Sequence, residues 1–389
     1  MGRQSARLWH DGKDHKDFWK LIDDEENYLG KSWRMHWQIY KGNKLLWGKL
    51  PPNFLLSTGE YYTPSGHFYD SVKGEKFTDN GFLKSYVDNC KTLYNFCKVG
   101  KYLFASYDVK IYFTENCYSW KEVKVVSSHI DDTVIYLGNY NERLLIITNN
   151  ELFVYDIQTD YIKELDMPNS SYINEPVGDK SYELKFCVMN DTLIVVTGEK
   201  NPYGMQDSEG LLVFKNDELV RHFYSFVTAP GFGKGFNSYV DCVTSDGKVA
   251  YLSGAANLFG IETNLSEGYK SSDGITWEKF ASPLYGSLFF LNGNLYSAMG
   301  SSITQVQLGK YLDGEFIRIE NNVNAYFYLV GKDSSQKNTF SAKGYIYGNI
   351  KDNDGNICFA RFKDYDSGES EILLNHGIAN GIYIESWED

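Results

Sequence analysis

Several features that define whole classes of protein are missing from this chain of 389 residues. It contains no run of 18 apolar residues, which excludes a membrane-spanning helix, so we expect no insertion into a membrane. Its net charge is -13 and it has only seven Arg, so we expect no surface for nucleic acid. Hydrophobic residues nevertheless make up 42% of the chain and aromatic residues 16%, which is too apolar for a disordered protein.

Cysteine is scarce as well, and its six residues are dispersed without a Cys-x-x-Cys pair: Cys90, Cys97, Cys117, Cys187, Cys242 and Cys358. The even number permits disulfides, but a chain of this length does not need them to build a core. We expect the thiols to act as small buried hydrophobic groups. The first 20 residues are charged and have no apolar segment, so we expect no secretory signal and synthesis in a cytoplasm.

Sequence patterns of metal and cofactor sites are also missing. The seven His never occur at the spacing of a zinc protease. Residues 352–356 resemble a calcium loop but lack the distant Glu, so we interpret them as a hairpin turn. Residues 231–235 are rich in glycine without a phosphate-binding pattern, which indicates an exposed loop. We therefore predict neither a metal nor a cofactor.

The first 50 residues differ in composition from the rest, because they contain five of the eight Trp and three of the seven Arg. Residues 33–40 alternate with period two, residues 41–44 form a turn, and residues 45–47 are apolar, which predicts a β-hairpin. Such a small unit would be marginally stable alone. We expect residues 1–52 to form a docking segment and residues 53–389 to form the main domain.

A strand–turn–strand pattern recurs from about residue 90 onward, at a spacing of about 50 residues that is typical of four-stranded propeller blades. The second strand of each repeat is expected at residues 101–105, 143–147, 192–196, 248–252, 294–298 and 344–348. The last strand is expected at residues 119–123, 161–165, 219–223, 276–280, 316–319 and 371–374. The small number of Ala, 12, also favours strands over helices.

Six repeats therefore cover about residues 90–375, and residues 53–80 together with 381–384 could make a seventh, closed by both ends of the chain. We predict an all-β protein: a β-propeller with six or seven blades of four antiparallel strands, preceded by a small N-terminal β-hairpin. A pair of β-sandwiches or a β-helix remains an alternative. Residues 82–97 are the main exception, because their apolar spacing suits a short helix or an irregular entry.

One motif resembles the Asp-box of sialidase-like propellers, a turn between the third and fourth strands of a blade. It consists of Ser271, Asp273, Gly274, Thr276 and Trp277, and it lacks one residue between Asp and Gly. We expect the Asp to accept backbone hydrogen bonds, the Gly to supply a permissive φ and the Trp to pack between blades. A second, degenerate copy has Asn116 in place of the Asp, ends at Trp120, and has no Gly. Such turns serve folding in enzymes and non-enzymes alike.

The same resemblance defines what a sialidase would need: an arginine triad, a Tyr/Glu nucleophile pair, an acid/base Asp and an early Phe/Tyr-Arg-Ile-Pro strand. No such tetrapeptide occurs in this sequence. The arginines of the repeats are Arg143, Arg221, Arg318 and Arg361, and we expect each to be solvated or stacked at a strand. We therefore predict a protein that is not an enzyme, with a sialidase-like glycoside hydrolase acting on surface glycans as the alternative.

The N-terminus carries a second resemblance. Arg-Gln-Ser-Ala-Arg-Leu at residues 3–8, Gly-Lys-Asp-His-Lys at 12–16 and Leu-Leu-Trp-Gly-Lys-Leu at 45–50 look like the opening of phage and prophage minor structural proteins from Gram-positive gut bacteria. The resemblance covers about 50 residues. It implies a virion tail or baseplate component, assembled in the cytoplasm of a bacterial host, whose leader docks on other tail proteins in an oligomeric assembly. Packing of the leader on its own propeller is the alternative.

Trp and Arg concentrate in buried association surfaces, which favours docking through this segment. The candidate docking residues are Arg3, Arg7, Trp9, His15, Trp33, Trp37 and Trp47. We expect the propeller loops to recognise a host-surface ligand, a glycan or a protein, through aromatic stacking and hydrogen bonds. The candidate loop residues are Tyr61, Tyr62, Tyr203 and Phe232. A purely structural tail plug or collar is a further alternative.

Overall fold

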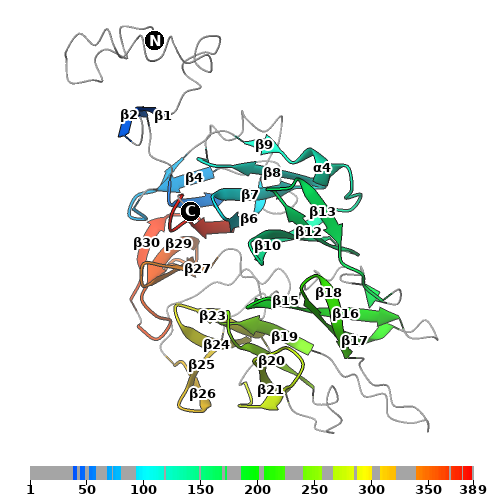
Figure 1. The fold of residues 1–389 in the computed structure, drawn as a ribbon. Coiled ribbons are helices and arrows are strands. Elements are labelled where there is room, and N and C mark those ends of the chain that lie inside the picture. Colours follow the sequence, from blue (N-terminus) through cyan, green and yellow to red (C-terminus); the bar gives the residue numbers. More distant parts are fainter. Residues whose placement is uncertain are drawn as a thin grey trace, which may run out of the picture.

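The computed structural model describes residues 38–41, 44–48, 52–57, 68–71, 73–79, 93–117, 120–148, 150–168, 171–172, 185–200, 206–223, 240–255, 266–283, 287–299, 307–320, 339–367, 369–378 and 380–387. Within these ranges the chain forms seven antiparallel sheets around a common centre and a separate two-stranded hairpin (Figure 1). The predicted all-β propeller is confirmed, and its blades number seven.

The first three blades follow each other along the chain. Blade 1 contains β6 (Tyr94–Val99), β7 (Tyr102–Tyr107), β8 (Lys110–Thr114) and β9 (Lys121–Glu122). Blade 2 contains β10 (Val134–Tyr140), β11 (Arg143–Thr148), β12 (Leu152–Asp156) and β13 (Tyr161–Glu164). Blade 3 contains β15 (Lys185–Met189), β16 (Thr192–Lys200), β17 (Gln206–Lys215) and β18 (Glu218–Phe223), and a short β14 (Ser171–Tyr172) also pairs with β16. A single helical turn, α4 (Lys124–Ser127), connects blades 1 and 2.

The next three blades repeat this arrangement. Blade 4 contains β19 (Val240–Ser245), β20 (Ala250–Ala255), β21 (Ser266–Ser271) and β22 (Glu278–Lys279). Blade 5 contains β23 (Ser287–Leu291), β24 (Asn294–Met299), β25 (Gln307–Leu312) and β26 (Glu315–Arg318). Blade 6 contains β27 (Phe340–Ala342), β28 (Tyr345–Lys351), β29 (Ile357–Phe362) and β30 (Glu371–Leu374).

The seventh blade is built from both ends of the propeller, as the sequence suggested. Its innermost strand is β31 (Asn380–Tyr383), which pairs with β3 (Phe54–Ser57), followed by β4 (Phe68–Ser71) and β5 (Thr78–Asp79). Beyond the strands, the backbone N–H of Ile384 donates to the carbonyl of Asn53 at 2.7 Å, and Nε1 of Trp387 donates to the carbonyl of Pro52 at 2.9 Å. These contacts join residues more than 300 positions apart and close the ring.

Burial explains why the strands differ in sequence. The second and third strands of a blade have both faces covered by neighbouring blades, so they contain runs of buried apolar residues, as in β11 and β12 of blade 2. The fourth strands lie at the rim, where side chains such as those of β13 and β18 are largely exposed. Seven clusters of buried side chains lie one at each interface, for example Leu55 with Leu103 between blades 7 and 1. The core is therefore a ring of interfaces.

The predicted strands mostly match, with shifts of up to four residues at their ends. The strand expected at residues 248–252 begins at Ala250, and the short last strands of blades 1 and 4 contain two residues each. The helical interpretation of residues 82–97 is wrong at its end, because Tyr94–Val99 form β6; residues 82–92 lie outside the described ranges. A β-strand also accepts spaced apolar residues when both of its faces are buried, so spacing alone could not decide.

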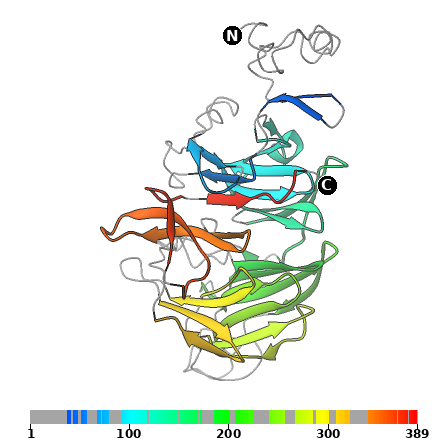
Figure 2. The same ribbon diagram turned by 90° about the vertical axis from the view of Figure 1, so that its left-hand side faces the viewer.

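The N-terminal hairpin consists of β1 (Gln38–Lys41) and β2 (Lys44–Gly48), which pair antiparallel around the expected turn. It forms its own sheet and lies outside the ring of blades in both views (Figures 1 and 2). Residues 33–37, predicted to extend its first strand, lie outside the described ranges.

Candidate functional site

The turn that resembles an Asp-box, called the Asp-box turn below, lies in blade 4 and connects the third strand, β21, to the fourth, β22. Asp273 Oδ1 accepts hydrogen bonds from the backbone N–H groups of Ile275 at 2.8 Å and Thr276 at 2.7 Å, and from Ser271 Oγ at 3.0 Å. Burial alone would raise the pKa of Asp273, but these hydrogen bonds lower it below its ordinary value. Trp277 closes the turn by donating from Nε1 to the carbonyl of Gly274 at 3.1 Å.

The same turn contacts the preceding blade. Gly274 has a φ of +77°, and a Cβ placed on it would lie 3.0 Å from Val213 and 3.1 Å from Thr192, both in blade 3. Trp277 packs against the buried cluster that blades 3 and 4 share. The Asp-box turn therefore holds two blades together at their outer part, which is a role in folding.

The degenerate copy in blade 1 has the same form. Asn116 and Thr114 are hydrogen-bonded at 3.2 Å, and Trp120 Nε1 donates to the carbonyl of Cys117 at 3.2 Å. Cys117 adopts a φ of +64° in the position that Gly274 has in blade 4, and its side chain is fully buried between blades 7 and 1. A cysteine thus fills the place that the motif assigns to glycine.

A third copy escaped the sequence reasoning. In blade 7, the backbone N–H of Gly74 donates to Ser71 Oγ at 2.8 Å, Gly74 has a φ of +78°, and Phe77 is buried between blades 6 and 7. All three turns share a hydroxyl residue, a residue with positive φ three positions later, and an aromatic residue three positions after that, which is buried in Trp120 and Phe77 and partly buried in Trp277. That spacing is present in the sequence, but Lys73 occupies the position of Asp273, where the motif expects Asp. The sequence pattern therefore did not identify this copy.

We expect Gly274→Ala to destabilise the protein by about 2 kcal/mol, because Ala is strained at positive φ and its Cβ would press on blade 3. Gly293→Ala is the matched control: Gly293 also has a φ of +77°, but a Cβ there would meet nothing within 4 Å. The control should cost about 1 kcal/mol, from backbone strain alone. Urea unfolding measures both, and equal losses would show that the turn does not press on the neighbouring blade.

The four arginines of the repeats have separate surroundings. Arg143 makes a bidentate ion pair across blades with Asp217, at 2.6 and 2.7 Å, which raises the pKa of the guanidinium. Arg361 pairs with Glu371 at 2.7 Å and lies over the ring of Tyr345. Arg221 lies over Phe223, and Arg318 is 3.6 Å from Glu320. In the described residues, the arginines therefore do not converge on one another.

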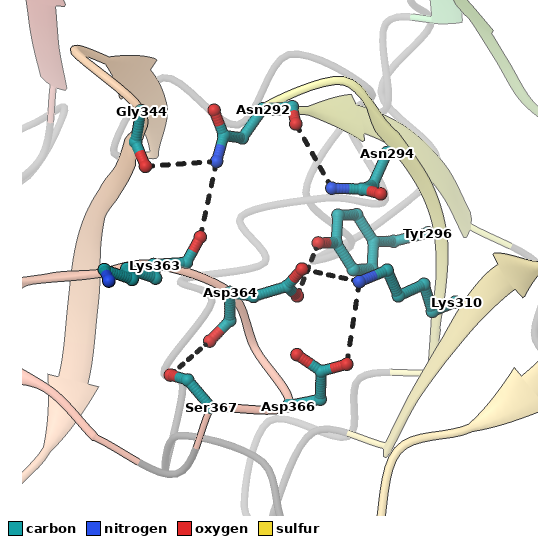
Figure 3. Close-up of polar contacts among 9 residues, drawn as sticks. All are labelled: Asn292, Asn294, Tyr296, Lys310, Gly344, Lys363, Asp364, Asp366 and Ser367. Atoms are coloured by element: carbon teal, nitrogen blue, oxygen red, sulfur yellow. Dashed lines mark hydrogen bonds and ion pairs between the residues drawn. The ribbon is translucent and has the colours of Figure 1, made fainter.

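A polar cluster links blades 5 and 6 (Figure 3). Asp364, in the loop after β29, accepts a hydrogen bond from the Tyr296 hydroxyl at 2.7 Å and an ion pair from Lys310 Nζ at 2.5 Å. Asp366 approaches the same ammonium at 3.6 Å. Tyr296 is fully buried, and the Lys310 side chain is only 12% exposed. Burial would raise the pKa of Asp364, but Lys310 and Tyr296 lower it.

Asn292 extends this link on the same side of the blades (Figure 3). Its Nδ2 donates to the carbonyls of Gly344 and Lys363, both at 3.3 Å, and its backbone N–H donates to Ser341 Oγ at 2.7 Å. The turn at the inner end of blade 5 is therefore fastened to two loops of blade 6. This polar cluster fixes blades 5 and 6 relative to each other, and its charged groups, Lys310, Asp364 and Asp366, are paired with one another.

The suspected calcium loop is a hairpin turn between β28 and β29, as the sequence indicated. Asp352 Oδ1 accepts hydrogen bonds from the backbone N–H groups of Asp354 at 2.9 Å and Asn356 at 2.8 Å. The hydrogen bond that Asn356 Nδ2 donates to Asp352 Oδ2 at 3.1 Å, together with these backbone bonds, lowers the pKa of Asp352. Within the described ranges, no group of three or more His, Cys, Asp or Glu is placed to hold a metal ion.

The five described cysteines, Cys97, Cys117, Cys187, Cys242 and Cys358, are buried free thiols, and Cys90 lies outside the described ranges. Burial raises the pKa of Cys97 to about 12, so its reactive thiolate form is suppressed. These five residues therefore pack as small hydrophobic groups, in agreement with the sequence-based expectation. Among the described residues, no helix has the length and apolar character to span a membrane.

The centre of the ring contains a channel of about 460 Å³, lined by the innermost strands of six blades. Its aromatic lining comes from Phe96, Tyr136, Phe289, Phe290 and Phe340. Its polar lining comes from amides and hydroxyls: Asn95, Thr244, Asn292, Thr339, Ser341 and Asn380. The remaining described lining residues are Leu137, Leu291 and Gly381, so none of them carries a charge. The volume lies within the ~300–1,000 Å³ that ligand pockets usually have.

The loop candidates of the sequence analysis, Tyr61, Tyr62, Tyr203 and Phe232, lie outside the described ranges. The docking candidates Arg3, Arg7, Trp9, His15, Trp33 and Trp37 also lie outside them, and Trp47 is placed only as a residue of β2. The sequence reasoning missed the central channel, because its lining residues come from strands that are far apart in the sequence and look like ordinary core strands.

Comparison with known proteins relates the chain to solved β-propellers at low identity. No family model and no curated protein matches it. The β-propeller domain of the Trilobed protease from Pyrococcus furiosus is 11% identical with a TM-score of 0.47, over 83% of this chain and 93% of that one. Dipeptidyl peptidase 4 from Porphyromonas gingivalis is 9% identical with a TM-score of 0.44, over 82% of this chain and 52% of that one. A xyloglucanase from Xanthomonas campestris is 12% identical with a TM-score of 0.43, over 82% and 58%. The chain thus spans little more than half the length of the last two proteins.

Proposed function

We propose that this chain is a non-enzymatic structural and adhesion component of a phage tail or a related particle. In this proposal, residues 1–52 dock on other tail or baseplate proteins, and the propeller recognises a host-surface ligand, in particular a glycan. The N-terminal resemblance supports the first part. The chemical character of the centre of the ring supports the second part.

One observation carries the proposal that the propeller binds a ligand without transforming it: the described lining of the central channel is aromatic, amide and hydroxyl, and it is neutral throughout. Hydrolysis of a glycoside generally needs two carboxyl groups beside the bond, and a sialic acid needs guanidinium groups for its carboxylate. Rings and amides instead suit the retention of an uncharged ligand. Arg143 and Arg361, which a sialidase could use, are engaged in ion pairs with Asp217 and Glu371.

A glycan array combined with a turnover assay tests the ligand part. We expect the full chain to retain one or more glycans on the array and to release no product from sialosides or cell-wall polymers over the same period. Product release would contradict the proposal and favour the alternative of a sialidase-like glycoside hydrolase. A blank array would contradict the adhesion role and favour a purely structural plug or collar.

The docking part is tested in assembled particles with substitutions in the full chain. We expect a chain with Trp33→Ala and Trp37→Ala to be lost from purified particles, because both Trp residues lie in the segment that carries the resemblance. Trp277→Phe is a control in the propeller, where it should leave incorporation unchanged. Normal incorporation of the double variant would contradict docking through these residues.

A further inference from the structure

The central channel is lined by a hydrogen-bond donor that the described fold does not use. Asn380, on the innermost strand of the closing blade, is only 3% exposed, and its Nδ2 has no hydrogen-bond partner among the residues that the structure describes. A buried donor without a partner destabilises a protein, so such a group calls for a physical explanation. The residue opposite it in the strand pair, Ser57, does not supply a partner, because its hydroxyl is also buried and makes no hydrogen bond within the described part of the chain.

The other amides of the channel differ from Asn380. Asn95 Nδ2 donates to Ser106 Oγ at 2.7 Å and to the carbonyl of Val134 at 3.2 Å, both in the neighbouring strands. Asn292 holds the two loops of blade 6. These amides serve the packing of blades, whereas the amide nitrogen of Asn380, a residue that also lines the channel, is buried and makes no hydrogen bond within the described residues.

Two phenylalanines that line the channel have rings that stack on a second ring. Phe340 stacks on Tyr347 with ring centres 5.4 Å apart and planes 3° apart, and Phe290 stacks on Tyr251 at 6.4 Å and 11°. Both phenylalanines are only partly buried, and both line the channel. Rings that are fixed by a second ring lose little freedom when a ligand packs on them, which favours binding.

We propose that the central channel binds a neutral saccharide of one or two sugar units, with Asn380 Nδ2 donating to a ligand oxygen and the lining rings packing on its C–H faces. A sugar presents apolar C–H groups and many oxygen acceptors, which matches a lining of rings, amides and hydroxyls. A charged ligand would lose its hydration without gaining an opposite charge from the described lining residues. The channel of about 460 Å³ corresponds to the volume of about 15 water molecules, at ~30 Å³ each.

This inference rests on the proposed recognition of a host-surface ligand and names its site and ligand class. The test uses the full chain and isothermal titration with neutral probes: glucose, galactose, N-acetylglucosamine, lactose, cellobiose and chitobiose. We expect at least one of them to bind. Asn380→Leu, which replaces the unused donor with an apolar group of similar size, should weaken that binding about tenfold without lowering the melting temperature. Thr244→Val, a substitution on another blade, should weaken saccharide binding several-fold. This second variant keeps the test decisive if Asn380→Leu does not fold.

Asn349 provides the matched control, because it is buried in blade 6 and fully used. Its Nδ2 donates to the carbonyl of Ile378 at 2.8 Å, and its Oδ1 accepts from the backbone N–H of the same residue at 2.9 Å. Asn349→Ala should lower the melting temperature and leave saccharide affinity unchanged in the folded protein. Unchanged affinity in both Asn380→Leu and Thr244→Val would overturn the channel site while leaving the adhesion role standing. Binding only of sialosides or peptides would overturn the ligand class, and retention of no ligand at all would overturn the adhesion role as well.

Discussion

A chain that ends at residue 379 should lose its cooperative fold, because residues 380–389 contain the strand that closes the ring. Without β31, the strand β3 loses its hydrogen-bonded neighbour in blade 7. The side chains of Phe54 and Leu56 also lose packing contacts in the cluster between blades 6 and 7. The segment buries Ile382, Tyr383 and Ile384 to different extents, and a fully buried side chain of this kind is worth ~1.5–3 kcal/mol. The loss is then of the order of the whole stability of a typical domain, ~5–15 kcal/mol. Unfolding in urea, followed by near-ultraviolet circular dichroism, would measure it.

Two further samples make this result specific to the strand. Trp387→Phe removes the hydrogen bond to the carbonyl of Pro52 and a small part of the packing on the cluster between blades 7 and 1, and it should cost about 1 kcal/mol. A synthetic peptide of residues 380–389, added to the truncated chain, should restore part of the cooperative transition, because it can pair with the exposed edge of β3. A truncated chain that melts like the full chain would show that the ring does not depend on its seventh blade.

Asp364→Ala should destabilise the protein by about 3 kcal/mol, the largest effect we expect from a single substitution outside the apolar core. The substitution leaves the hydroxyl of Tyr296 buried without an acceptor and leaves Lys310 with the more distant Asp366 alone. Removing one partner of a largely buried ion pair is costly because the remaining charge is poorly solvated. The urea midpoint at unchanged denaturant slope would report the loss.

Asp366→Ala is the matched control for this prediction, since it removes a carboxylate from the same loop and the same lysine. Asp366 is 50% exposed and lies 3.6 Å from Lys310 Nζ, so its loss should cost less than ~0.5 kcal/mol. Equal effects of the two substitutions would contradict the role that we assign to Asp364.

The effect of Asp364 should also depend on pH in a defined direction. Its pKa is lowered in the folded state, so its stabilising effect is complete above the unfolded value of ~3.9 and is lost as the pH falls through the lower folded value. The pKa of Lys310 is raised, so its effect is complete below ~10.4 and is lost as the pH rises through the higher folded value. The difference between wild type and Asp364→Ala should therefore be largest between about pH 5 and 9 and shrink in acid. A difference that stays constant down to pH 2 would contradict an ionic contribution of Asp364.

Much of the fold was accessible from the sequence because propeller blades are local structures. Each blade is an up-and-down sheet whose strands are connected by short turns, so apolar runs and turn residues mark it directly. The last strand of blade 6, residues 371–374, coincides with β30, and the motif around Asp273 lies between a third and a fourth strand. Residues 94–97 were harder, because spaced apolar residues suit a helix and a doubly buried strand equally.

The candidate site was much less accessible. Asn380 and Phe340 look like ordinary strand residues in the sequence, and only the arrangement of blades around an axis brings them to one channel. The pair of Lys310 and Asp364 joins two blades across 54 positions, and nothing in the local sequence of either residue selects the other. The turn at Ser71 is recognisable from the spacing of its hydroxyl, glycine and aromatic residues when the position of Asp273 is allowed to vary.

By itself the sequence determined the strands and tight turns of this protein. The hydrogen bonds of a turn such as that at Asp273, and the alternation of apolar and polar side chains along a strand, depend on residues only a few positions apart. Only the tertiary structure decided that the blades number seven, which charges pair across them and where the channel lies. Closure joins Asn53 to Ile384, 331 positions away, and such a contact forms only when every blade between them has the size and twist that complete the circle.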